Sequence, residues 1–226
     1  MALLGQAAVA MWWTVETADL GEFQEWHSKE HLPERLAIPG FNRGSRWMRA
    51  GSGDFFVIYE LADYATLTSD AYRARLNDPT PWSTRMMPLH RDMVRSQCRV
   101  ATSAGRGIAT FMLTVQLSPR PDREHDLRNY LDRSIAELPL RQGITGAPLL
   151  QTDTPQVLAT KEQRIRGGDA VADWIMLVTG YEHAALSQAE DDILGRASLS
   201  DAGAADSASA GPFNLVHAMT PADAKV

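Results

Sequence analysis

The chain has 226 residues, of which 44% are hydrophobic and 22% charged, and its formal net charge is −6. This composition is typical of globular proteins, and the length suits one large domain or two of about 100 residues each. The negative charge, without any Lys/Arg cluster, gives no electrostatic case for binding nucleic acid or an anionic membrane. The single cysteine, Cys98, excludes an internal disulfide and a cysteine-based metal cage. No run reaches the roughly 18 apolar residues of a membrane span, and the N-terminus lacks a basic signal-peptide segment, so we expect a cytoplasmic protein.

The first half of the chain predicts the order β-α-β-β-α-β. Apolar β-formers predict a strand at 8–15, and Asp19 with Glu22 resembles a capping box that starts a helix. This helix is expected to reach about Leu32 and to stop or restart at Pro33. Further along we expect strands at 41–50 and 54–61, a helix at 64–76 and a strand at 93–102. This order defines a ferredoxin-like unit.

The second half repeats the same order more weakly. The expected elements are a strand at 108–117, a helix at 122–138, a two-part extended segment at 149–166, a strand at 173–180, a helix at 183–196 and a strand at 213–219. The Ala- and Ser-rich segment 198–211 is expected to be a flexible loop.

Local matches between the halves support an internal repeat. The spacing Leu-Pro-x-Arg-x-x-Ile-x-Gly occurs at 32–40 and again at 138–146, and the strand residues from Asp54 match those from Asp173. We therefore predict two domains, 1–103 and 104–226. A ferredoxin-like sheet carries helices on one face only, so its other face needs a cover. The predicted fold class is α+β, with tandem ferredoxin-like (βαββαβ) repeats forming an intramolecular barrel of the dimeric α/β-barrel type.

Two histidines in the first predicted helix form the most distinctive motif. His27 and His31 are four residues apart, so both imidazoles share one helical face, with Glu30 on its flank. With about 100° per residue, Leu20 and Phe23 fall on the same stripe. The corresponding stripe of the second half contains no histidine and is formed by Leu127, Tyr130, Ser134 and Leu138, with a one-residue ambiguity in the alignment.

The segment His27-Ser-Lys-Glu30-His31 also matches the inverted zincin pattern H-x-x-E-H. A zincin needs a third ligand from another long helix, and Pro33 interrupts this one. We therefore predict no metal site here, and keep another divalent metal as an alternative. A purely structural alternative places both histidines at the solvated helix rim, with Glu30 as a salt-bridging neighbour.

The motif and its surroundings resemble a known family. Phe23-x-x-Trp26, His31-x-Pro33, Ile38-Pro39-Gly40 and the arginines Arg43 and Arg46 are similar to the EthD-like group of the dimeric α/β-barrel superfamily. That superfamily includes small antibiotic-biosynthesis-type monooxygenases. The resemblance implies a ligand cavity between the sheet and the first helix, with His31 as the functional histidine. The EthD-like group pairs two short chains, whereas this chain fuses two copies.

We therefore expect an enzyme that performs cofactor-independent acid/base or oxygenase-like chemistry on a small apolar or aromatic substrate. His31 would be the general acid/base, with His27 or Glu30 orienting it. Its place at a helix end, beside Glu30, predicts a pKa at or above the ordinary value unless burial opposes it. The expected substrate-binding residues are Trp12, Trp26, Trp47 and Arg46.

Two alternatives come from other classes of protein. One is a non-catalytic small-molecule or haem-binding barrel, and the other is a structural scaffold with surface histidines. The expected partner is a small-molecule ligand, and a homodimer is compatible with these features. The remaining histidines, His90, His125, His183 and His217, have no neighbouring motif and receive no role.

Overall fold

The computed structural model describes residues 2–153, 160–167 and 169–224, which form two compact units. The N-terminal unit comprises Leu4–Arg99, Asp153–Val171 and Val216–Val226. The C-terminal unit comprises Met1–Leu3, Val100–Thr152 and Ala172–Leu215. Each unit thus draws on both halves of the sequence.

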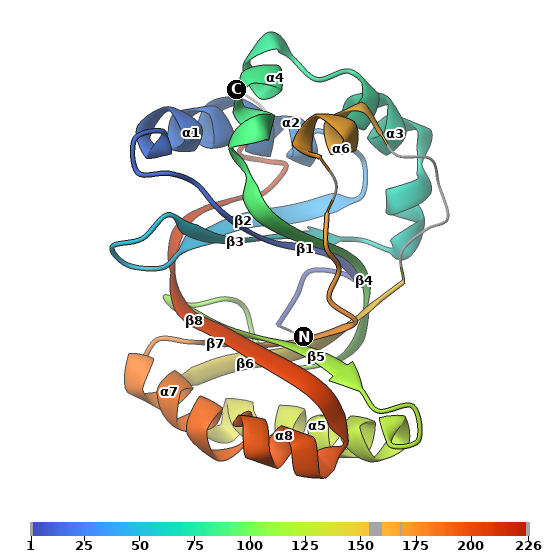
Figure 1. Cartoon of the computed structure of the whole chain (residues 1–226), viewed down its shortest axis with the longest axis vertical. Helices are drawn as coiled ribbons and strands as arrows, with labels where there is room; N and C mark the ends of the chain where they lie inside the picture. Colours follow the sequence, from blue (N-terminus) through green and yellow to red (C-terminus); the bar gives the residue numbers. More distant parts are fainter. Residues whose placement is uncertain (1, 154–159, 168, 225–226) are drawn as a thin grey trace. The chain divides into compact units, whose positions relative to one another are not determined.

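The N-terminal unit contains an antiparallel sheet in the order β4-β1-β3-β2 (Figure 1). Its strands are β1 (Ala7–Thr14), β2 (Phe41–Met48), β3 (Asp54–Leu61) and the first part of β4 (Arg91–Gly105), up to Arg99. The order matches the ferredoxin-like arrangement, in which the first and last strands of the unit are neighbours.

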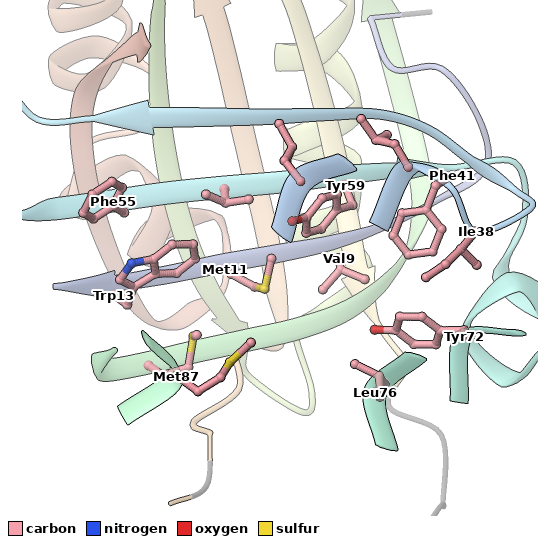
Figure 2. Close-up of a cluster of buried hydrophobic side chains, with 14 of the residues drawn as sticks. Val9, Met11, Trp13, Ile38, Phe41, Phe55, Tyr59, Tyr72, Leu76 and Met87 are labelled. Atoms are coloured by element: carbon pink, nitrogen blue, oxygen red, sulfur yellow. The ribbon is translucent and has the colours of Figure 1, made fainter. Parts of the chain in front are cut away.

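Helices cover one face of this sheet (Figure 1). They are α1 (Leu20–Trp26), a π-helical turn at His27–His31, α2 (Leu32–Leu36), 3-10 turns at Tyr64–Thr68 and Met87–Leu89, α3 (Asp70–Asn77), α4 (Pro81–Met86) and α6 (Lys161–Arg166). Because successive strand residues point to opposite faces, Val9, Met11 and Trp13 of β1 pack under these helices. Figure 2 shows this cluster, in which the rings of Tyr59 and Tyr72 lie with Val9 and Met11.

The C-terminal unit contains a second antiparallel sheet in the order β8-β5-β7-β6. Its elements are β5 (Phe111–Pro119), α5 (Glu124–Glu137), a 3-10 turn at Leu138–Leu140, β6 (Ile144–Thr152), β7 (Trp174–Gly180), α7 (His183–Asp192), α8 (Arg196–Ala202) and β8 (Ala204–Met219). Its own apolar cluster includes Leu127, Leu131 and Leu138. The predicted mixed α+β class is confirmed.

The helix was predicted to stop or restart at Pro33, and it restarts there: α2 begins at Leu32, and Pro33 occupies its first turn, where the missing N–H has no partner to lose. Two other local predictions were wrong in part. Asp19 occupies the N-cap position of α1, but its side chain makes no capping hydrogen bond. The predicted helix at 64–76 begins as a 3-10 turn, and only Asp70–Asn77 is α-helical.

Two segments expected to be irregular or extended contain helices. Within the predicted extended segment 149–166, residues 161–166 form α6, which begins with a capping box between Thr160 and Gln163; residues 154–159 lie outside the described residues. The predicted loop 198–211 instead contains α8 and the start of β8, separated at Gly203, which has a φ of 117°. Glycine ends the helix there because it adopts this left-handed conformation without strain.

No helix in the described ranges is long and apolar enough to cross a membrane.

Candidate functional site

The two predicted histidines lie on a π-helical turn between α1 and α2. His27–His31 form this turn, and the Leu32 N–H donates to the carbonyl of His27, five residues back. Such i→i+5 turns are rare and often mark functional sites. The turn is buried at its two ends, since His27 is 1% exposed and His31 8%. The alternative of surface histidines is therefore wrong.

Aromatic rings surround both imidazoles. The ring centroids of His27 and His31 are 5.5 Å apart, and the Trp26 ring lies 4.6 Å from His31. Trp13 and Phe23 lie 6.1 and 6.3 Å from His27. The Nδ1 atom of each histidine is buried and has no hydrogen-bond partner among the described residues.

This environment keeps both imidazoles neutral. Burial lowers the pKa of His27 well below its ordinary value, and the nearby cation of Arg46 acts in the same direction. Burial likewise lowers the pKa of His31, with Arg35 as the next cause. The structure therefore differs from the expectation of an ordinary or raised His31 pKa, because loss of hydration outweighs the helix end and Glu30.

Glu30 lies apart from this pair, although it is adjacent to His31 in sequence. One of its oxygens accepts from the Trp26 indole N–H at 3.2 Å, from the Thr80 hydroxyl at 2.5 Å and from the Ser83 hydroxyl at 3.2 Å. These bonds connect the π turn to α4. Glu30 therefore positions Trp26 rather than either imidazole.

His90 joins the histidine pair from a distant part of the sequence. Its ring centroid lies 4.8 Å from Trp13 and 5.0 Å from Phe23, and its Nδ1 is 2.9 Å from the Met87 carbonyl oxygen. Burial lowers its pKa to about 3. Sequence analysis missed this residue because no spacing relates it to His27. The strand order could have indicated it: His90 directly precedes β4, and β4 pairs with β1, which carries Trp13.

A buried ion pair lies beside His31. The Arg35 guanidinium donates to both Glu162 oxygens at 2.5 and 2.6 Å, and the two side chains are 4% and 2% exposed. The other guanidinium nitrogen of Arg35, Nη1, is buried without a hydrogen-bond partner among the described residues. The Tyr59 hydroxyl is also buried without a hydrogen-bond partner among the described residues. Burial raises the pKa of this phenol. Gly44 makes room for this ring, because a Cβ there would lie 3.0 Å from Tyr59 and 2.8 Å from Leu32.

These groups line a small inner cavity within the N-terminal unit. The cavity has a volume of about 30 Å³, and its lining includes His31, Arg35, Tyr59, Tyr72 and Arg95. This space accommodates one or two waters or a few ligand atoms.

A larger outer pocket of about 510 Å³ lies in the same unit. Tyr72, Leu76 and Arg95 line both spaces, so the two meet at these side chains. The remaining lining of the outer pocket among the described residues is Leu67, Arg73, Asn77, Gln97, Thr160, Gln163 and Arg164.

The predicted substrate-binding residues divide between the two faces of the sheet. Trp26 and Arg46 lie on the helix-covered face, where Trp26 contacts His31 and Arg46 donates to the Gln24 carbonyl at 3.2 Å. Burial lowers the Arg46 pKa to about 10. Trp12 and Trp47 lie on the opposite face, both paired in register with Phe56. These two tryptophans therefore do not share a pocket with the histidines.

The described residues contain no group of three His, Cys, Asp or Glu side chains that could hold a metal ion.

Comparisons with known proteins define the fold class. No family model and no curated protein matches the sequence. Among solved structures, an anthrone oxidase-like protein has a TM-score of 0.65 at 11% identity, over 97% of this chain and 95% of its own. A provisionally named monooxygenase from Fusobacterium nucleatum has a TM-score of 0.62 at 6% identity, with 96% of each chain covered. An uncharacterised ferredoxin-fold protein from Listeria monocytogenes, related to antibiotic biosynthesis monooxygenases, has a TM-score of 0.51 at 8% identity and covers 95% of this chain and 97% of its own.

The chain thus shares the ferredoxin-like fold of these solved structures, and the predicted fold is confirmed at that level. At these identities the similarity describes the fold and not the reaction.

Proposed function

We propose that the N-terminal unit binds a small, largely aromatic molecule and that His31 removes a proton from it in a cofactor-independent, oxygenase-like reaction. The observation that carries the proposal is the set of unpaired polar atoms around the inner cavity. His31 Nδ1, Arg35 Nη1 and the Tyr59 hydroxyl are all buried without a partner among the described residues. Each such group costs on the order of 1–3 kcal/mol. A ligand oxygen and an acidic hydrogen placed in the cavity would satisfy all three.

The proton transfer follows from the charge state of these groups. A neutral imidazole can accept a proton at its free nitrogen, and burial keeps His31 neutral. The substrate would be a phenol or an enolisable ketone, whose proton moves to His31 while the electron pair remains as a phenolate or enolate. The imidazolium and the substrate anion form together, so each offsets the cost of burying the other.

Arg35 and Tyr59 would stabilise the developing oxyanion. Glu162 holds the Arg35 guanidinium charged and fixed, and Nη1 remains available to donate a hydrogen bond. The Tyr59 hydroxyl is a second donor, and its raised pKa keeps it protonated. Preorganised donors at the point where charge develops give the largest single contribution in many enzymes. His27, 5.5 Å from His31, would fix the position of the acceptor ring.

Dioxygen is the co-substrate that we propose for the second stage. Solved structures of this fold are named anthrone oxidase-like and monooxygenase. An electron-rich enolate can be oxidised by dioxygen directly. Conversion of an activated CH2 group to a ketone uses one dioxygen, places one oxygen atom in the product and releases the other as water.

The alternative of a haem-binding barrel fits the described residues poorly. The space beside His31 is about 30 Å³, so a tetrapyrrole centred on a His31-bound iron would have no room, whereas an aromatic substrate lying mainly in the outer pocket would need to bring only its reacting atoms to His31. No step of the proposal therefore involves haem.

The EthD-like assignment and the fused repeat are also part of this proposal. Both units show the strand order of a ferredoxin-like sheet, and only the N-terminal unit carries the buried histidines. We propose that the chain is a tandem repeat forming an intramolecular barrel, with one functional site and a second copy that serves the fold.

Oxygen uptake with anthrone and with 1-naphthol tests the proposed function. We expect uptake with at least one of them, and at least a hundredfold slower rate in His31→Gln at an unchanged melting temperature. His125→Gln, at an exposed histidine of the C-terminal unit, is the matched control and should keep the full rate. Absence of uptake with both compounds, or uptake that survives His31→Gln, would contradict the proposal.

A further inference from the structure

Three arginines line the outer pocket. Among the described residues its lining includes the three arginines Arg73, Arg95 and Arg164, but no aspartate or glutamate. The whole chain has a net charge of −6, so the sign of this pocket is opposite to that of the protein. Arg73 is paired with Asp70 at 2.7 Å, so the argument for a bound anion rests on the buried Arg95.

Arg95 is the buried cation of this pocket. It is only 8% exposed, and its guanidinium donates to the neutral Tyr72 hydroxyl at 2.6 Å. None of the ion pairs among the described residues includes Arg95, whereas the neighbouring Arg35 is paired with Glu162 and Arg166 with Asp169. A buried charge is costly unless an opposite charge accompanies it. The missing anion is thus expected from outside the chain.

The position of Arg95 follows from the register of β4. Arg95 lies opposite Met11 of β1, and Gln97 lies opposite Val9, so both polar residues project on the helix-covered face among apolar neighbours. Strand alternation therefore places a guanidinium and an amide at a position that apolar packing alone would fill with aliphatic residues.

The other walls of the pocket suit an aromatic body. Leu67, Leu76 and the ring of Tyr72 are apolar, and all three belong to or adjoin α3. Tyr72, Leu76 and Arg95 also line the inner cavity at His31. A molecule with its anionic group at Arg95 would therefore lie where the two spaces meet.

We infer that the ligand of the outer pocket is an aromatic carboxylic acid whose carboxylate is bound by the Arg95 guanidinium. This inference rests on the proposed function, because it names the substrate class of the same site. A guanidinium binds a carboxylate through two parallel hydrogen bonds, and an amide of the same shape cannot replace this charge.

Calorimetric titration with 2-naphthoate and with its neutral isostere 2-naphthamide tests the inference. We expect the wild-type protein to bind 2-naphthoate at least tenfold more tightly than 2-naphthamide, and the difference to shrink at high salt. Arg95→Gln should abolish the preference without weakening binding of the amide, and Arg95→Lys should keep part of it. Arg133→Gln, at an exposed arginine of α5, is the matched control and should bind like the wild type.

Equal affinity of the wild type for both compounds, no binding of 2-naphthoate, or a preference that persists in Arg95→Gln would overturn the inference. The wild-type comparison is decisive even if Arg95→Gln is poorly folded. Binding is measured without turnover, so the His31 variants separate the two proposals: His31→Gln should retain the preference for 2-naphthoate. Oxygen uptake that depends on His31, without any preference for the acid, would leave the proposed function standing and remove this inference.

Discussion

His31 is buried with its Nδ1 atom unpaired, which is an unfavourable arrangement for a residue that serves only the fold. Packing alone would favour an aliphatic side chain at such a site, because a buried unpaired polar atom lowers stability. In the C-terminal unit the corresponding helix, α5, has its one histidine, His125, exposed in the first turn, and the buried residues at its end include Ile135 and Leu138. The imidazole is therefore explained by ligand chemistry better than by stability.

Replacement of His31 by leucine tests whether the histidine contributes to the stability of the fold. We expect His31→Leu to change the free energy of unfolding by less than about 1 kcal/mol or to raise it, because an apolar side chain of similar size removes an unpaired polar atom. Urea unfolding followed by tryptophan fluorescence measures the change. The reverse substitution at a fully buried leucine, Leu138→His, is the control and should lower the stability by about 2–4 kcal/mol. A loss of several kcal/mol in His31→Leu would show that the histidine holds the fold.

The three buried histidines also predict how stability depends on pH. Burial lowers the folded-state pKa of His27, His31 and His90 below the unfolded value of 6.5, with His90 at about 3. Below pH 6.5 the unfolded chain therefore binds more protons than the folded one, so stability is complete above this pH and falls as the pH decreases. Each buried histidine contributes a slope of about 1.4 kcal/mol per pH unit in this window, down to about pH 3 for His90.

Urea unfolding at pH 7.5, 6.0 and 5.0 measures this slope. His90→Leu should reduce the loss between pH 6.0 and 5.0, whereas His125→Gln, at an exposed position, should leave it unchanged. A stability that stays constant over this range would contradict the assigned neutral histidines.

The segment that carries His27 and His31 is a π-helical turn and not part of an ordinary α-helix. Its i→i+5 bond encloses one residue more than the i→i+4 bond of an α-helix. The sequence alignment of the two halves had a one-residue ambiguity between the stripes ending at His31 and Leu138. An extra residue in the first helix explains that ambiguity, since α5 is α-helical throughout Glu124–Glu137.

Deletion of one residue tests the role of the π turn. Removing the exposed Lys29, whose ion pair with Glu25 is at the surface, should convert the turn to an α-helix and keep the residues on either side in place. We expect the melting temperature to stay within a few degrees, while oxygen uptake is lost because the spacing of His27 and His31 changes from four residues to three. Circular dichroism and thermal unfolding measure the fold.

The matched control is deletion of Arg133 in α5. This helix has no extra residue, so the deletion rotates its buried stripe by about 100° and should unfold the protein. If both deletions unfold the protein equally, the π turn is not an inserted residue and its functional role is wrong.

The sequence allowed most elements to be predicted, but only part of the site. Short runs of apolar, β-forming residues placed β1, β3 and β7 within one or two residues of their observed bounds. Local composition misled at α6 and α8, because polar and small residues typical of loops are also compatible with short, capped helices. The pairing of Arg35 with Glu162 spans 127 residues, and no sequence spacing encodes such a contact.

On the scale of the whole molecule, the two units do not coincide with the two halves of the sequence. Asp153–Val171 and Val216–Val226 belong to the N-terminal unit, although they follow residue 103. The first of these segments supplies Glu162, the carboxylate that compensates the buried charge of Arg35. The site thus depends on a segment from the second half, and the predicted boundary between 103 and 104 separates Arg35 from its partner.

This interleaving leads to a prediction for the isolated first half. A fragment of residues 1–103 retains β1, β2 and β3 with α1–α4, but it loses Glu162. Removing one partner of a buried ion pair costs about 3–5 kcal/mol, which is a large part of the stability of a domain of this size. The helix-free face of its sheet, with Trp12, Trp47 and Phe56, adds an apolar surface that nothing else in the fragment covers. We therefore expect the fragment to precipitate or self-associate, as measured by analytical ultracentrifugation.

The Arg35→Met form of the same fragment separates the two causes. If the unpaired charge alone prevents folding, this form should become monomeric and cooperatively folded. If the apolar face is responsible, it should gain helical content but still self-associate, because methionine removes the buried charge without covering the sheet. We expect the second result, since an exposed sheet face with two tryptophans is a strong association surface whatever lies on the helical side. A wild-type fragment that is monomeric and melts cooperatively would contradict both arguments, and with them the proposal that the sheet of each unit requires a cover from the rest of the chain.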